Sequence, residues 1–225
     1  MQDNVIHLQK GNSMTRSDLT HLYFLLDRSG SMQSIKSDTE GGFTAFVEQQ
    51  RTASGACRVT LAQFDSVYEE VFRDVPVADV PPLLLEPRGS TALLDSIGRL
   101  VTEAGSRLAA LPEDQRPGTV VVAIMTDGLE NASHEWTHPA VKALVEQQTA
   151  AYGWQFLYMG ADQDAIEVGT SMGISAEHAV TYGRGSVDRV MAATSAKVAS
   201  LRQARLVDAA APMRAYTAQE RSDAE

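Results

Sequence analysis

Apolar runs of strand length alternate with longer helical patterns along most of this chain, and this alternation is what most limits its fold. The clearest strand is Val120–Met125, where all six residues are apolar and most are β-branched, as expected of a strand covered on both faces. Strands joined through helices pair in parallel by right-handed crossovers. We therefore expect an α/β fold, with a doubly wound, mostly parallel, Rossmann-like sheet and helices on both faces.

The boundaries of the elements follow from the spacing of apolar residues. The sequence predicts strands at residues 19–26, 57–64, 68–75, 120–125, 154–159 and 178–182, and helices at 39–53, 92–110, 137–150, 162–172 and 186–210. Only Asp65, Ser66 and Val67 separate the second strand from the third, which is short enough for a hairpin. We therefore expect the third strand to be an antiparallel edge strand.

The apolar pattern covers most of the chain, which favours a single domain. We expect a polar N-terminal extension at residues 1–17, one domain at 18–210 and a mobile C-terminal tail at 211–225. Such polar termini are commonly mobile unless something holds them.

Composition excludes several classes of function. The net charge is −10 and no basic run is present, which argues against nucleic-acid binding because that needs clustered Lys and Arg. No apolar run approaches the roughly 20 residues that span a membrane, and the first 17 residues lack the apolar core of a signal peptide. The single cysteine, Cys57, allows no internal disulfide. These features predict a cytoplasmic protein that contacts neither membrane nor nucleic acid.

Oxygen-bearing side chains lie at three separate ends of the predicted strands and helices. Asp27, Ser29 and Ser31 come directly after the first strand, Thr91 precedes a helix, and Asp127 ends the most apolar strand. In a doubly wound sheet these positions meet beyond the carboxyl ends of the strands, where ligands bind. Oxygen ligands are those that Mg²⁺ prefers, and Mn²⁺ is suited to them as well. The five residues therefore predict one metal site, although each of them alone is equally typical of a helix cap.

The predicted ligand set has a consequence for what the site binds. Hydroxyl groups carry no charge, so two carboxylates among five side chains leave the cation electrophilic. An open coordination position then favours an anionic ligand, such as an Asp or Glu of a protein partner. This is the chemistry of a binding site, with no catalytic residue. The sequence does not set the oligomeric state.

The motif around these residues resembles a known family. The order Asp27-x-Ser29-x-Ser31, then Thr91, then Asp127-Gly128 resembles the metal-ion-dependent adhesion site (MIDAS) of von Willebrand factor type A (vWA) domains. The sequences at residues 27–32, 89–93, 126–128, 128–133 and 158–166 are most similar to small stand-alone bacterial and phage members.

The resemblance implies more about the site than the residues do alone. It implies a vWA fold with an intact MIDAS, in which Ser29, Ser31 and Thr91 bind the cation directly. Asp27 and Asp127 would act largely through water and hydrogen bonds. We therefore expect a non-catalytic, divalent-cation-dependent protein-binding module.

The alternative is a Mg²⁺-dependent phosphohydrolase of the haloacid-dehalogenase type. Such an enzyme would have an Asp nucleophile after the first strand and a second Asp two residues later as general acid. The later position here is Ser29, which argues against this alternative. A dinucleotide-binding fold is less favoured, because no G-x-G-x-x-G follows the first strand.

Several charged residues near the motif have a structural interpretation and a functional one. Glu130, Asn131 and His134 are expected either to contact a partner or to form an exposed loop. Asp65 is typical of a turn residue, and Arg28 and Arg88 are expected to be exposed to solvent.

Overall fold

The computed structural model describes residues 15–225 and shows one six-stranded sheet. The strand order is β3-β2-β1-β4-β5-β6, and all neighbours are parallel except β2 and β3, which are antiparallel. The strands are β1 (Arg16–Asp27), β2 (Ala56–Phe64), β3 (Tyr68–Pro76), β4 (Pro117–Thr126), β5 (Gln155–Ala161) and β6 (Ala179–Tyr182). The predicted doubly wound sheet with one antiparallel edge strand is confirmed.

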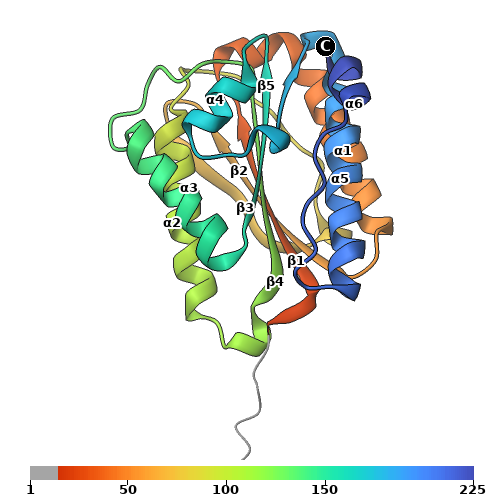
Figure 1. Ribbon diagram of the computed structural model, residues 1–225. Coiled ribbons are helices and arrows are strands. Elements are labelled where there is room, and N and C mark those ends of the chain that lie inside the picture. The colour runs from red at the N-terminus through yellow and green to blue at the C-terminus, as the bar shows by residue number, and fades with distance from the viewer. Residues whose placement is uncertain (1–14) are drawn as a thin grey trace, which may run out of the picture.

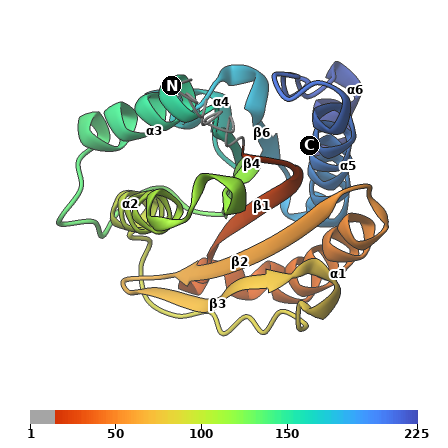
Figure 2. The same cartoon turned by 90° about the horizontal axis from the view of Figure 1, so that it is seen from below.

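Helices cover both faces of the sheet (Figures 1 and 2). One face carries α1 (Lys36–Thr52), α5 (Val187–Val207) and α6 (Ala218–Ala224), and the other carries α2 (Leu93–Ala110), α3 (His138–Tyr152) and α4 (Ala165–Ser171). Within residues 15–225, none of these helices combines the length and apolarity that a membrane crossing requires.

The central strand β1 divides the core in two. Its residues from Leu19 to Asp27 are all buried, and alternate side chains point to opposite faces. Phe24 meets Phe43 of α1 edge-to-face, with ring centroids 5.3 Å apart. Tyr23 stacks on Trp154 on the other face, at 6.2 Å. Packing on both faces fixes β1 and therefore the loop that follows Asp27.

The C-terminal segment differs from the mobile tail that the sequence predicts at 211–225. Met213 and Tyr216 are buried, and the Tyr216 hydroxyl lies 2.7 Å from Thr194 Oγ1 of α5. Thr217 and Glu220 cap α6 reciprocally. Two apolar anchors and a capped helix therefore hold a segment whose polar composition suggested mobility.

The N-terminal boundary also differs in part. β1 begins at Arg16, inside the extension expected at residues 1–17, and Arg16 N donates a hydrogen bond to Arg116 O at 2.8 Å. Residues 1–14 of that predicted extension lie outside the described residues.

Gly98 in α2 supports the packing of Trp136. A Cβ at position 98 would lie 2.1 Å from Cδ2 of the indole ring, which is far inside van der Waals contact. Overpacking in Gly98→Ala is therefore expected to lower the free energy of unfolding by about 1–3 kcal/mol. The gain of up to about 1 kcal/mol in helix propensity offsets part of this cost, so the net loss is up to about 2 kcal/mol. Urea denaturation measures the difference.

Gly105→Ala is the matched control in the same helix. A Cβ there would lie 3.8 Å from Gln148 Nε2, an ordinary contact. We expect this variant to be as stable as the wild type or more stable by up to about 1 kcal/mol. Equal effects of the two substitutions would contradict the packing role of Gly98.

Lys197 of α5 is a buried cation. Its side chain is 0% exposed, its Nζ donates to Glu177 O at 3.0 Å and lies 3.9 Å from the Tyr216 ring centroid. Burial, and then the charge of Arg214, lower the pKa of Lys197 to about 7. Between this value and the ordinary value of 10.5, the unfolded chain keeps a proton that the folded protein releases.

Stability should therefore rise with pH over this window, because the unfolded state binds more protons there. Below pH 7 the ammonium is charged in both states, and the folded state carries the cost of burying it. In Lys197→Met this rise should be absent, while Glu177 O keeps its hydrogen bond from Tyr216 N. Urea denaturation of both proteins from pH 6.5 to 9.5 measures the difference, and parallel pH profiles would contradict the effect.

Candidate metal centre

The predicted site residues meet at one edge of the sheet. Asp27 ends β1, Asp127 follows β4, and Thr91 comes just before α2. β1 and β4 are adjacent parallel strands, so their carboxyl ends lie side by side. The chain winds outward in opposite directions from this pair, which makes it the switch point where such sheets bind ligands.

Asp27 is fully buried and joins the first loop to β4. Its Oδ1 accepts a hydrogen bond from Ser29 N at 2.6 Å, and its Oδ2 accepts one from Thr126 Oγ1 at 2.5 Å. Burial raises the pKa of Asp27 to about 6, although the Thr126 hydrogen bond acts in the opposite direction. Both oxygens are therefore engaged in holding protein groups.

The hydroxyl groups form a continuous polar chain toward Asp127. Ser29 Oγ lies 3.1 Å from Ser31 Oγ, and Ser31 Oγ donates to Asp127 Oδ1 at 2.6 Å. A Cβ built on Gly128 would lie 3.2 Å from Thr91 Oγ1 and 3.8 Å from Ser31 Oγ. Because both oxygens lie within 4 Å of one point, they are less than 8 Å apart. The structure thus brings all five predicted residues together.

The donor set suits a hard cation. The five side chains supply only hydroxyl and carboxylate oxygens, which are ligands typical of Mg²⁺. Among residues 15–225, no group of three or more His, Cys, Asp or Glu side chains could hold a metal ion. Ser29 and Thr91 are buried and Ser31 is exposed, which leaves one side of the cluster facing solvent.

A buried ion pair next to the first loop could not be predicted from the sequence. Arg28 is 5% exposed, and its Nε donates to Asp65 Oδ2 at 2.9 Å, which Arg88 Nε also contacts at 3.0 Å. Arg88 N donates to Arg28 O at 2.8 Å. The network links the first loop to the segment that leads to Thr91. The expectation of a solvent-exposed Arg28 was wrong, because its carboxylate partner comes from a hairpin 37 residues away.

Glu130 anchors the loop after Asp127 to the start of α2. Its carboxylate accepts hydrogen bonds from Leu94 N at 2.8 Å, Ala132 N at 2.8 Å and Ser133 N at 2.7 Å. Burial raises its pKa, but these hydrogen bonds outweigh it and hold the pKa below the usual value. Glu130 therefore points inward instead of toward a partner.

Asn131 and Asp95 also join the loop after Asp127 to the start of α2. Asn131 Oδ1 accepts from Thr91 N at 2.9 Å, and Asn131 N donates to Thr91 O at 3.0 Å. Asp95 Oδ1 accepts from Glu135 N at 2.9 Å and from Trp136 N at 2.7 Å. Thr91 is thus held by backbone and side-chain contacts on both of its peptide groups.

Arg184 is a further residue that the sequence did not reveal. It begins the short helix η5 (Arg184–Ser186) after β6, and its Nη1 donates to Asp127 Oδ2 at 2.8 Å. The two residues are 57 positions apart, so no local pattern could have connected them. A cation of the protein thus lies beside the predicted metal site.

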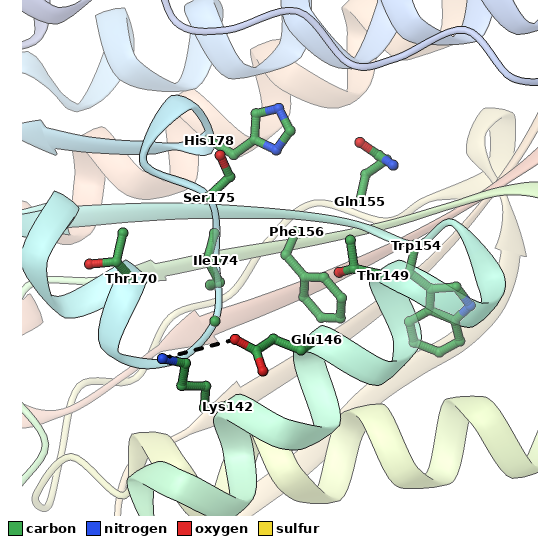
Figure 3. A pocket seen from close by; sticks show the side chains of 11 residues that line it. Lys142, Glu146, Thr149, Trp154, Gln155, Phe156, Thr170, Ile174, Ser175 and His178 are labelled. Atoms are coloured by element: carbon green, nitrogen blue, oxygen red, sulfur yellow. Dashed lines mark ion pairs between the residues drawn. The ribbon is translucent and has the colours of Figure 1, made fainter.

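A cavity of about 330 Å³ lies elsewhere, between α3, α4 and the start of β5 (Figure 3). It is lined by Lys142, Glu146, Phe156, Ile174 and His178 among others, and the Lys142 and Glu146 side chains form an ion pair at 3.9 Å. None of the five predicted metal ligands lines it. This cavity is therefore separate from the candidate site.

Removing the Glu130 carboxylate should destabilise the loop. Glu130→Ala leaves the three amide donors without their acceptor, so we expect the free energy of unfolding to fall by about 1–3 kcal/mol. Glu135→Ala, an exposed carboxylate in the same loop, should change it by less than about 0.5 kcal/mol. Chemical denaturation measures both, and equal effects would argue against the anchoring role of Glu130.

Comparison with solved structures finds vWA proteins with the same fold. The zinc-occupied MIDAS form of proximal thread matrix protein 1 from the mussel byssus has a TM-score of 0.55 at 14% identity, over 83% of this chain and 46% of that one. The vWF domain of the type V pili tip protein Mfa5 from Porphyromonas gingivalis has a TM-score of 0.57 at 11% identity, over 80% and 94%. The ArnB paralog VWA2 from Sulfolobus acidocaldarius has 0.52 at 12%, over 79% and 44%.

The chain spans less than half of the mussel and Sulfolobus proteins. No family model matches the sequence, and no curated protein does. The likeness therefore concerns the fold and not the activity of any one neighbour. With its six-stranded sheet and strand order, the protein has the fold of von Willebrand factor type A domains.

Proposed function

We propose that this protein is a non-catalytic, divalent-cation-dependent protein-binding module. The observation that carries the proposal is the convergence of five oxygen side chains from three separate segments at the switch point of the sheet. Ser29, Ser31 and Thr91 would hold Mg²⁺ or Mn²⁺ directly. Asp27 and Asp127 would act through water. The bound cation would supply an electrophilic centre for an oxygen ligand.

The hydrogen bonds of Asp27 support a role in which this residue acts through water and does not bind the cation directly. Both of its carboxylate oxygens already accept protein hydrogen bonds at 2.5–2.6 Å, so its carboxylate serves best as a buried negative charge and a brace. The hydroxyl groups then remain as neutral ligands. Such a cation keeps much of its positive charge, and an Asp or Glu side chain of a partner would complete the site.

The surroundings of the site also suit a protein partner. Leu129, two residues after Asp127, is 58% exposed. Apolar side chains beside a polar anchor are typical of protein interfaces. Ser29 stands where a phosphohydrolase of the haloacid-dehalogenase type needs its second Asp, and we therefore assign no catalytic step to this site.

Thr91→Ala is expected to weaken Mg²⁺ binding at least tenfold with little change in stability, because it removes one oxygen ligand from a strict octahedral ion. Ser90→Ala is the neighbouring control: the Ser90 side chain is exposed, and this variant should bind Mg²⁺ like the wild type. Thr91→Ser keeps the hydroxyl and should restore binding. Isothermal titration with MgCl₂ measures affinity, and circular dichroism checks the fold.

The requirement for a cation is tested with a partner or an acidic peptide. Binding in MgCl₂ should be lost in EDTA and recovered when excess Mg²⁺ is added back. Equal affinity with and without chelator would refute the proposed function. Turnover of phosphate esters that is lost in Asp27→Asn would support the phosphohydrolase instead.

A further inference from the structure

Arg184 places a fixed positive charge against the predicted metal site. Its Nη1 donates to Asp127 Oδ2 at 2.8 Å and to Ser34 Oγ at 2.7 Å, and it lies 3.3 Å from Ser31 O. Ser31 and Asp127 both belong to the predicted cation site. The guanidinium therefore contacts this site directly.

A second carboxylate holds the guanidinium in place. Arg184 Nε donates to Asp162 Oδ2 at 2.7 Å, from the loop that follows β5. Asp162 has a backbone φ of +49°, which an Asp tolerates better than most residues. Asp162 and Asp127 thus contact Arg184 from two strand ends, and 37% of the Arg184 side chain faces solvent.

The charges at the site explain what this arrangement does. Asp27 and Asp127 alone would balance a divalent cation, but Arg184 offsets part of the negative charge of Asp127. Asp162 neutralises Arg184 only in part, because its side chain is half exposed and its charge is screened by water. A positive charge one side chain away from a cation weakens its binding, and more strongly where water is partly excluded. Asp127 does not depend on Arg184 alone for its position, because Ser31 Oγ also donates to it at 2.6 Å.

We propose that Arg184 restrains the affinity of the free site for its cation, so that an acidic group of the partner is needed to balance the charge. This inference rests on the proposed function and adds a regulating residue to it. The cation and the acidic ligand then bind cooperatively, since each one lowers the unfavourable charge that the other meets. Arg184 is a positioning and charge-setting residue and not a metal ligand.

The experiment measures Mn²⁺ affinity by electron paramagnetic resonance on the full chain without any partner. Arg184→Gln removes the charge and should bind Mn²⁺ about 3–10-fold more tightly than the wild type. Arg184→Lys keeps the charge but loses the planar fork, and its affinity should stay within about twofold of the wild type. Thermal melts of each variant check the fold.

Asp162→Asn should change the Mn²⁺ affinity in the opposite direction to Arg184→Gln. The Asn side chain keeps an oxygen that can accept the hydrogen bond from Arg184 Nε, but the substitution removes a neutralising charge. Asn also tolerates the left-handed backbone at this position. We expect Mn²⁺ to bind about 2–3-fold more weakly, since Asp162 is half exposed and its charge is partly screened. If Arg184→Gln folds poorly, the Asp162→Asn variant still tests the inference.

A second measurement repeats the titrations with a short peptide that contains a single glutamate. The peptide should raise the Mn²⁺ affinity of the wild type by a larger factor than that of Arg184→Gln. Equal factors would overturn the proposed cooperativity.

The outcomes separate this inference from the proposed function. A wild type that binds no Mn²⁺ would remove the proposed function and with it the basis for a role of Arg184. If the wild type binds Mn²⁺ but Arg184→Gln binds it equally or more weakly, the metal site stands and the inference is overturned. Equal gains in affinity for the Gln and Lys variants would assign the effect to side-chain geometry and contradict the charge argument.

Discussion

The buried carboxylate of Asp27 is the constraint on which the rest of the site depends. A charged group at the end of a central strand is tolerated only when its oxygens find donors, and here Thr126 of β4 and the amide of Ser29 supply them. The same two hydrogen bonds fix the first loop over the end of β4. In this position Ser31 Oγ donates a hydrogen bond to Asp127, so the hydroxyl groups lie beside a second carboxylate.

Side chains outside the motif keep the site in shape. Asp65 joins Arg28 to Arg88 on one side, and Glu130 joins the loop after Asp127 to the start of α2 on the other. Both carboxylates have a pKa below the usual value, because hydrogen bonds outweigh the effect of burial. A site made of short hydroxyl side chains has little reach of its own, so its geometry has to come from a rigid surrounding shell.

In the binding module that we propose, the charges at the site are incompletely balanced. Neutral hydroxyl groups, two carboxylates and the guanidinium of Arg184 together favour an anionic ligand. A site that bound its cation tightly on its own would have less to gain from a partner. The position of Arg184 therefore links the strength of the metal site to the presence of an acidic group on another molecule, within the function that we propose.

The sequence by itself determined the class of fold, the antiparallel edge strand and the five residues of the candidate site. Those features follow from local patterns, such as the apolar run at Val120–Met125 and the spacing of Asp27, Ser29 and Ser31. Only the tertiary structure decided that Arg28 is buried, that Glu130 points inward, that residues 211–225 pack on α5, and that Arg184 contacts Asp127. Each of these depends on a partner brought from a distant part of the chain, and the packing of helices on the sheet, rather than any local spacing, creates that proximity.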